Sequence, residues 1–262
     1  MNLDLTGKNA FVGGSTQGIG EASAYELARL GATVTLIARN ETRLQQVCAK
    51  LDVSKGQKHD YIVADFSQPE DLKQKAEKYL SSGKIIHILV NNTGGPAGGQ
   101  IISAQTHDFL AAYQMHLFCN HILTQAVVPG MKTAGYGRII NVISTSVKIP
   151  ITGLGVSNTT RGAVASWAKT LANELAEFGI TVNNVLPGFT ETQRFFTLVE
   201  IWAKAAGISE AEMSEKLKKT VPAARFATPD ETAYAIVFLA SPSAAYINGI
   251  NLPVDGGRTG SL

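Results

Sequence analysis

The sequence has few cysteines, no long apolar run and little excess charge of either sign. Its two cysteines, Cys48 and Cys119, are too few for a disulfide framework and lack metal-ligand spacing, so we expect two small buried hydrophobes and no metal site. No apolar run approaches the about 18 residues of a membrane span, and the N-terminal segment MNLDLTGK contains no apolar signal region. These absences predict a cytoplasmic protein.

The charge balance excludes two classes of partner. Lys and Arg number 23 against 21 Asp and Glu, which leaves a net charge of +2, and no dense basic run occurs. We therefore expect neither a nucleic acid nor an anionic membrane as partner. A chain of 262 residues that is 45% hydrophobic is long and apolar enough for one large α/β domain, so residues 1–262 are predicted to form a single domain.

Short β-branched runs alternate with longer amphipathic stretches along the whole chain. This alternation predicts a doubly wound, seven-stranded parallel sheet with helices on both faces and right-handed crossovers. The predicted strands are Asn9–Val12, Thr33–Ala38, Tyr61–Val63, Ile86–Val90, Arg138–Val142, Thr181–Leu186 and Asn251–Val254. Helical patterns include Glu21–Leu30, Thr42–Leu51 and Glu70–Leu80, the last preceded by the capping-box pattern Ser67-Gln68-Pro69-Glu70.

One segment, 193–225, departs from the alternation because two short helices replace a strand there. Ser209 and Glu212 form a capping-box pattern for the second helix. A helical insertion after a sheet strand usually covers the ligand crevice, so we expect this segment to be a lid. A plain surface excursion is the alternative.

A glycine-rich turn follows the first predicted strand and opens the first helix. It reads Gly13-Gly14-Ser15-Thr16-Gln17-Gly18-Ile19-Gly20. Glycine permits a tight turn and close approach of the backbone to a pyrophosphate, while the helix N-terminus offers free N–H groups to the anion. The turn therefore predicts a dinucleotide site, with a Gly-x-x-x-Gly-x-Gly spacing.

Later motifs occur in the order known from one family. Ala64-Asp65-Phe66 follows the third strand, Asn91-Asn92-Thr93-Gly94 ends the fourth, and Pro187-Gly188-Phe189-Thr190-Glu191-Thr192 ends the sixth. With the C-terminal segments Val221–Glu231 and Ile247–Gly257, these motifs resemble the classical short-chain dehydrogenase/reductase family (the 3-ketoacyl reductases in particular) over about residues 5 to 258. The resemblance implies a single-domain Rossmann fold. It also implies a nicotinamide dinucleotide held by Gly14, Ser15, Thr16, Gln17, Gly18, Ile19, Gly20, Arg39, Asp65, Phe66, Asn92, Thr93, Gly94, Arg161, Pro187, Gly188, Thr190 and Thr192.

Arg39 bears on the choice of cofactor. The second predicted strand ends in Ala38-Arg39-Asn40, where an acid would accept a hydrogen bond from the ribose 2′-hydroxyl of NAD(H). An arginine suits a 2′-phosphate instead, so we predict NADP(H), with NAD(H) possible. The alternative is that Arg39 stacks on the adenine, which either cofactor permits.

The catalytic positions depart from the family pattern. The family works with an Asn, a Ser, a Tyr and a Lys, and Ser144 matches its serine. Ser157 and Arg161 stand where the resemblance places the Tyr and the Lys, and His116 stands in place of the Asn. This Ser-Asn-x-x-Arg segment resembles an atypical branch of the family.

The four residues Ser144, Ser157, Arg161 and His116 are our candidate catalytic groups. Arg161 keeps a positive charge but cannot exchange a proton near neutral pH. Ser157 is too short to replace a phenol directly, although a bound water could bridge the gap. His116 is the one group whose ordinary pKa lies near 7, so it is a candidate proton donor; the alternative is a hydrogen-bonded core histidine.

Three functions remain open from the sequence. The first is an NADP(H)-dependent oxidoreductase acting on a small carbonyl compound or alcohol. The second is a catalytically silent dinucleotide sensor or regulatory partner, and the third is another reaction on the same scaffold, such as dehydration or isomerisation. The resemblance further implies a homo-dimer or homo-tetramer built through Asp108–Met131 and Asn158–Glu177, although the apolar side chains of these helices equally suit burial against the sheet.

Overall fold

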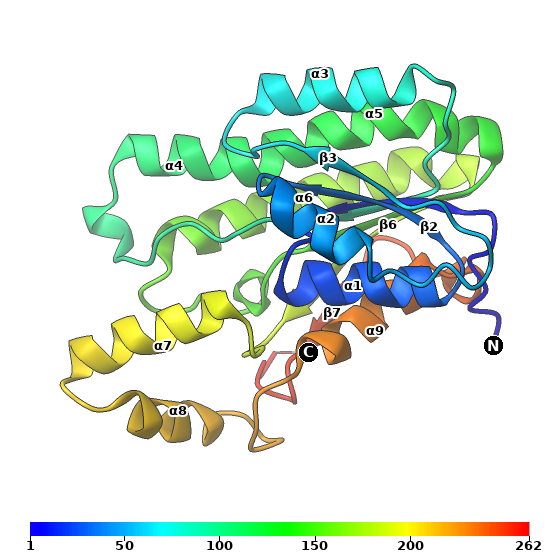
Figure 1. The fold of residues 1–262 in the computed structure, drawn as a ribbon. Helices are drawn as coiled ribbons and strands as arrows, with labels where there is room; N and C mark the ends of the chain where they lie inside the picture. Colours follow the sequence, from blue (N-terminus) through cyan, green and yellow to red (C-terminus); the bar gives the residue numbers. More distant parts are fainter. Residues whose placement is uncertain (262) are drawn as a thin grey trace.

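The computed structural model describes residues 1–261 and contains one seven-stranded sheet (Figure 1). The strand order is β3-β2-β1-β4-β5-β6-β7, and every neighbouring pair is parallel. The strands are β1 Asn9–Gly13, β2 Thr33–Ala38, β3 Asp60–Val63, β4 Ile88–Asn91, β5 Gly137–Val142, β6 Ile180–Pro187 and β7 Asn251–Val254. The predicted α/β Rossmann fold is confirmed, with β4 beginning two residues later than expected.

Helices cover both faces of the sheet, as the amphipathic patterns predicted (Figure 1). On one face α1 (Gly18–Arg29), α2 (Glu41–Cys48) and α9 (Pro229–Ala240) bury Leu27, Leu44 and Ile236 against the strands. On the other face lie α3 (Pro69–Leu80), α5 (Cys119–Ala134) and α6 (Gly155–Leu175), which bury Leu72, Leu123 and Ala172. Two apolar layers therefore hold the sheet rigid, and its carboxyl edge is left for the loops.

The start of α3 differs from the predicted capping box. The helix begins at Pro69 with Gln68 as N-cap and no side-chain cap, so Ser67 does not fill that role. Instead the Ser67 N–H donates to Asp65 Oδ1 at 2.9 Å, which folds the chain into a turn just before the helix. Proline at the first position needs no cap for its missing N–H, which is why the helix starts there.

The segment after β6 forms two helices, α7 (Gln193–Ala206) and α8 (Glu210–Lys218), which stand apart from the sheet layers in Figure 1. The predicted capping box of α8 is present, since Ser209 Oγ accepts from Glu212 N at 3.2 Å and Glu212 Oε2 accepts from Ser209 N at 2.9 Å. The pair has an apolar cluster of its own, centred on Phe189, Phe195 and Phe226. The helices are thus anchored beside the end of β6 rather than splayed into solvent.

The α4 helix (Thr106–Tyr113) continues through a π-helical turn, Gln114–Phe118, into α5. On this stretch Leu110 and Phe118 are 55% and 45% exposed, whereas Val164 on α6 is fully buried against the sheet. Some of the apolar side chains of these helices are therefore buried against the sheet, and others are exposed and available for an interface between subunits. Assembly into a homo-dimer or homo-tetramer stays a prediction, with Leu110 and Phe118 as its exposed candidates.

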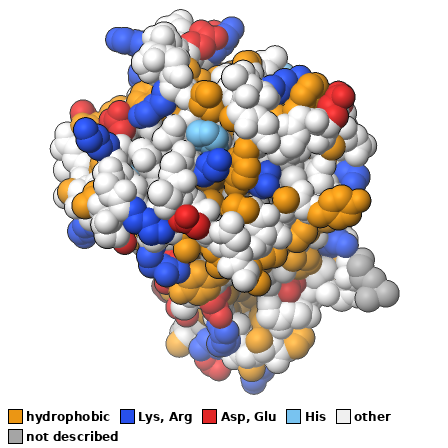
Figure 2. Space-filling view, turned by 90° about the vertical axis from the view of Figure 1, so that its right-hand side faces the viewer, with side chains coloured by type: hydrophobic (Ala, Val, Ile, Leu, Met, Phe, Trp, Pro, Cys, Tyr) orange, Lys and Arg blue, Asp and Glu red, His pale blue; other side chains and the backbone are white. Residues whose placement is uncertain are grey.

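Charged side chains of both signs are interspersed on the face shown in Figure 2, and its lowest part carries both signs. The α8 helix, lowest in Figure 1, has the matching composition: Glu210, Glu212 and Glu215 beside Lys216 and Lys218.

Within residues 1–261 no helix combines the length and the apolar character needed to cross a bilayer. Cys119 is buried as predicted, and Cys48 is half-buried.

Candidate active site

A cleft of about 520 Å³ opens at the carboxyl ends of the strands. The order of the strands reverses between β1 and β4, whose neighbours lie on opposite sides, and parallel sheets bind ligands at such switch points. The cleft is lined by the loops after β1, β2, β3, β4, β5 and β6, by α6 and by the first turns of α7. The glycine turn lines one part of it, and the candidate catalytic residues Ser144, Ser157 and Arg161 line another.

The glycine turn is shaped for close approach of a ligand. Gly14 and Gly18 have φ values of 55° and 57°, in the left-handed region that favours glycine. A Cβ on Gly20 would lie 2.3 Å from the Gly14 carbonyl oxygen, so this third glycine allows α1 to pack against the turn. The first N–H groups of α1 consequently face the cleft without side chains in the way, which fits a pyrophosphate.

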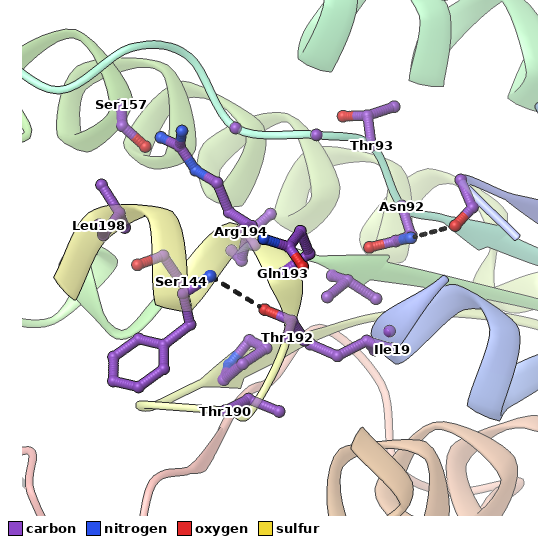
Figure 3. Close-up of a pocket in the computed structure, with 18 of the residues that line it drawn as sticks. Ile19, Asn92, Thr93, Ser144, Ser157, Thr190, Thr192, Gln193, Arg194 and Leu198 are labelled. Carbon is purple, nitrogen blue, oxygen red and sulfur yellow. Dashed lines mark hydrogen bonds between the residues drawn. The ribbon is translucent and has the colours of Figure 1, made fainter. Parts of the chain in front are cut away.

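Two of the predicted ligand residues also hold the turn in place. Asn92 Nδ2 donates to the Gly13 carbonyl at 3.1 Å and lies 3.4 Å from the Gly14 carbonyl, a bond drawn in Figure 3, so the end of β4 is tied to the end of β1. Ser15 Oγ is fully buried and accepts from Ile37 N on β2 at 3.1 Å. Ser15 and Gly20 do not line the cleft, whereas the other sixteen predicted cofactor residues do.

The adenine end of the cleft contains the predicted pair Arg39 and Asp65. The pKa of the Asp65 carboxyl is lowered, chiefly by the hydrogen bond from Ser67 N and to a smaller degree by the positive charge of Arg39. A second arginine, Arg43, donates from Nη2 to the Thr16 carbonyl at 3.2 Å. Sequence reasoning missed Arg43, although its position in the first turn of α2, three residues after the N-cap Asn40, was a usable signal.

The nicotinamide end is formed by the loop after β6. Gly188 is required there because a Cβ would lie 2.7 Å from Asp255 Cα. Thr192 Oγ1 accepts from Phe195 N at 3.2 Å and caps α7, so the loop and the first turn of α7 form one unit (Figure 3). Thr192 and Ile19 lie close together in Figure 3, which brings the loop over the start of α1.

Three of the four candidate catalytic residues line this end of the cleft: Ser144, Ser157 and Arg161. Ser144 Oγ accepts from Ser146 N at 3.1 Å, which leaves its own proton free to donate. Ser157 and Arg161 lie one turn apart on α6, and Arg161 Nη1 donates to the Val142 carbonyl at 3.1 Å. Burial, and then the charge of Arg194, lower the pKa of Arg161 to about 10, so it remains protonated at neutral pH.

His116 is placed differently from the other three. It is 1% exposed, and it borders a second cavity of about 310 Å³ rather than the main cleft. Its Nδ1 lies 2.6 Å from Thr93 Oγ1, a residue that does line the cleft, while its Nε2 has no partner within residues 1–261. Burial, with the charges of Arg161 and Arg194, lowers the pKa of His116 to about 2, so the ring is neutral and no imidazolium is available as a proton donor.

The lowered pKa of His116 predicts a loss of stability in acid. Below the ordinary histidine pKa of 6.5 the unfolded chain binds a proton that the folded chain does not, so stability falls as the pH falls. In urea unfolding between about pH 5 and 6.5, the free energy of unfolding should fall more steeply for the wild type than for His116→Asn, by up to about 1.4 kcal/mol per pH unit. Parallel curves would show that His116 is protonated in the folded state; His87 is common to both proteins and cancels.

Sequence reasoning missed Arg194, on the first turn of α7. Its Nη2 donates to the Pro96 carbonyl in the loop after β4, so the side chain spans the cleft. Figure 3 shows its guanidinium near Ser157, on the far side of Thr192 from Ile19. Nothing in the local sequence pattern of 193–225 indicates that Arg194 meets a loop so distant in the sequence.

Comparison with known proteins identifies the family of the chain. Residues 14–259 match the family described as "Enoyl-(Acyl carrier protein) reductase". The 3-oxoacyl-[acyl-carrier-protein] reductase of Aquifex aeolicus is 31% identical over 98% of this chain and 99% of its own length. A tropinone reductase homolog of Arabidopsis thaliana is 34% identical over 97% of this chain and 91% of its own.

A solved structure extends the likeness to three dimensions. The L-sorbose reductase of Gluconobacter frateurii, complexed with NADPH and L-sorbose, is 31% identical and superposes with a TM-score of 0.93 over 100% of both chains. Likeness of sequence and of fold therefore runs along the whole chain, from the glycine turn to β7. The chain belongs to the classical short-chain dehydrogenase/reductase family.

Proposed function

We propose that the protein is an NADP(H)-dependent oxidoreductase that interconverts a small carbonyl compound and its alcohol. The observation that carries this proposal is that the glycine turn, Arg39 and Ser144 all line the same cleft. A protein that only senses a dinucleotide needs the first two and has no use for a polarising hydroxyl at the nicotinamide end. The NADPH bound to the related L-sorbose reductase agrees with the proposed cofactor.

The cleft fits such a cofactor on its own geometry. Gly14 and Gly18 line the cleft at the start of α1, where the pyrophosphate would bind, and Arg39 and Arg43 supply positive charge for the 2′-phosphate. When bound, NADPH would supply a hydride to the carbonyl carbon. Arg161, protonated and lining the cleft, would hold the ribose hydroxyls next to the nicotinamide.

Arg39 should set the preference for NADP(H). Replacing it in Arg39→Ala removes the charged partner of the 2′-phosphate, so the Kd for NADPH should rise about 10- to 100-fold while the Kd for NADH stays nearly unchanged. Fluorescence titration with both cofactors measures the two constants. The control Arg29→Ala removes an exposed arginine at the end of α1, paired with Glu26 and outside the cleft. Equal losses for both cofactors would mean that Arg39 stacks on the adenine.

Ser144 and Thr93 have different roles at the carbonyl oxygen of the substrate: Ser144 polarises it and Thr93 donates the proton. Ser144 Oγ has its acceptor role occupied by Ser146 N, so its proton is directed to the substrate and polarises the carbonyl. Thr93 Oγ1 lines the cleft and stands where the family motif has Ala, and it is bonded to His116, which stands where the family has Asn. The two replacements thus form one hydrogen-bonded pair that reaches the cleft.

This pair supplies a proton route that requires no phenol and no imidazolium. Thr93 Oγ1 gives its proton to the oxygen, directly or through a water beside Ser157, and regains one from His116 Nδ1. A water molecule in the second cavity, itself reprotonated from solvent, would then give a proton to His116 Nε2, which has no partner within residues 1–261, so the ring changes tautomer and stays neutral. A pKa of about 2 is compatible with this relay because no charged histidine forms.

The proposal is tested by turnover. The purified protein is titrated with NADPH and NADH, and a panel of ketones, aldehydes and quinones is then added while the absorbance of the reduced cofactor is followed. Carbonyl-dependent oxidation of NADPH is the expected result. Tight binding without oxidation across the panel would favour the sensor or regulatory partner, and a changed product with unchanged cofactor would favour dehydration or isomerisation.

A further inference from the structure

The catalytic end of the cleft is strongly cationic. Three arginines line it, Arg161 on α6, Arg194 on α7 and Arg258 after β7. The one acidic side chain among the lining residues, Asp65, lies at the adenine end beside Arg39. Fixed charges of one sign in a cleft with apolar walls focus the electric field, so this end of the cleft attracts anions.

Arg161 and Arg194 face this space without acidic partners. Arg161 is buried, and its hydrogen bond goes to the neutral carbonyl of Val142. Arg194 likewise donates to a neutral carbonyl, that of Pro96, and neither arginine forms an ion pair within residues 1–261. The two cations also repel each other, since the charge of Arg194 contributes to the lowered pKa of Arg161.

Such an arrangement is costly for the protein alone. A buried charge without a counter-charge destabilises the folded chain, and a second like charge adds to the cost. Each guanidinium retains N–H donors beyond the one used on a backbone carbonyl, and its planar fork matches a carboxylate. The pair is therefore built to be completed by an anionic group that enters with a ligand.

The phosphates of the cofactor do not meet this need. They belong to the glycine turn at the start of α1 and to Arg39, at the opposite end of the cleft. In Figure 3 the guanidinium of Arg194 points away from Ile19 on α1 and toward Ser157. Ser144 and Ser157 mark the place of the reacting carbon, so the anion belongs to the substrate.

We propose that the substrate is an oxo acid, or the corresponding hydroxy acid, whose carboxylate binds Arg194, while Arg161, which holds the ribose, adds its positive charge beside it. The inference rests on the proposed oxidoreductase function. The reaction is oxo acid + NADPH + H⁺ → hydroxy acid + NADP⁺, in which the carbonyl carbon gains the hydride and its oxygen the proton. The remainder of the substrate meets Phe195, Leu198 and Trp202, which line the same end, so a partly apolar acid fits best.

A binding experiment isolates the anion site from turnover. Benzoate, phenylacetate and hexanoate, each beside its neutral amide, are titrated into the protein–NADPH complex by calorimetry. The wild type should bind the carboxylates at least about 10-fold more tightly than the amides, and Arg194→Gln should remove that difference. Arg194→Lys should restore part of it, because the charge returns without the fork. Arg29→Gln, which removes one exposed positive charge outside the cleft, should leave it intact.

A kinetic experiment then tests the substrate class. Benzoylformate and a series of oxo acids are compared with their primary amides as substrates, and Arg194→Gln should raise KM for the acids about 10- to 100-fold with KM for the amides little changed. Melting curves confirm that the variant is folded.

The possible outcomes separate the two proposals. Carboxylates that bind through Arg194 while no carbonyl is reduced would confirm the anion site and overturn the oxidoreductase function. Turnover of neutral carbonyls without preference for acids, and without effect of Arg194→Gln, would keep the function and overturn the inference. A loss of NADPH affinity in Arg194→Gln with unchanged carboxylate binding would assign Arg194 to the cofactor and also overturn it, as would failure of every carboxylate to bind.

Discussion

Ser144→Ala should lower the turnover of any carbonyl substrate about 100- to 1,000-fold, with the Kd for NADPH changed little. The substitution removes the hydroxyl that donates to the carbonyl oxygen, where negative charge develops as the hydride arrives. Because Ser144 Oγ is already held by Ser146 N, the hydroxyl is oriented before the substrate binds, and such preorganised donors have the largest effects on rate. Steady-state kinetics under NADPH saturation measures the loss, which should appear in kcat as much as in kcat/KM.

A matched control for this variant lies on α6. Ser166→Ala removes a hydroxyl of the same kind from an exposed position outside the cleft and should leave kcat unchanged. If Ser144→Ala retained full turnover, the retained family serine would be a capping residue of the turn at 145–147 and the chemistry would depend on Thr93 and His116. Ser144 would then have no catalytic role.

Gly20→Ala should abolish dinucleotide binding and also destabilise the fold. The new Cβ would lie 2.3 Å from the Gly14 carbonyl oxygen and 2.7 Å from Asn92 Nδ2, so the turn and the start of α1 would have to separate. We expect the Kd for NADPH to rise at least about 100-fold and the free energy of unfolding to fall by about 1–3 kcal/mol. Fluorescence titration and urea unfolding measure the two effects.

Gly162→Ala is the control for this substitution. Gly162 lies within α6, and no atom outside the helix lies within 4 Å of the position of its new Cβ. Alanine there should raise the free energy of unfolding by about 0.5–1 kcal/mol, because it lowers the entropy of the unfolded chain without a steric conflict. Normal NADPH affinity in Gly20→Ala would show that α1 can shift without loss of the site, which would contradict the packing argument.

The positions that differ from the family pattern meet in the structure. Thr93 contacts His116, and the charges of Arg161 and Arg194 both act on that histidine. Burial, and to a smaller degree the charges of Arg161 and Arg194, keep the histidine neutral, and in the proposed route a neutral histidine passes a proton through the Thr93 hydroxyl without acquiring charge. This arrangement is the basis of the proton route proposed above, in which Thr93 and His116 act in place of the Tyr and Lys of the family.

The sheet and the glycine turn between β1 and α1 could be predicted because their signals are local. A strand shows its period over a few residues, and a glycine turn between a strand and a helix carries its own spacing, so all seven strands were found within two residues. The capping box predicted at Ser67 was wrong because a local pattern does not show which other hydrogen bonds compete for the same residue. The local sequence predicted Ser67 as a helix cap, but the backbone N–H of Ser67 donates to Asp65 Oδ1 in a turn before the helix.

The catalytic end could be predicted only in part. Register with the family motif placed Ser144, Ser157 and Arg161 in one cleft, and the structure brings them together there. The register could not show that His116 faces a separate cavity, nor that Arg194 reaches across to Pro96. Those facts depend on how α5, α7 and the loop after β4 pack, and these segments are distant in the sequence.

The amino-acid sequence by itself therefore determined the order of the elements, and it predicted where the nucleotide binds and where the chain departs from the family's catalytic pattern. These follow from short-range periodicity, turn chemistry and residue identity. The tertiary structure alone decided that His116 is neutral and that Arg194 lies near Arg161. Both depend on burial and on the distance between charges from separate elements, and neither quantity exists until the chain is folded.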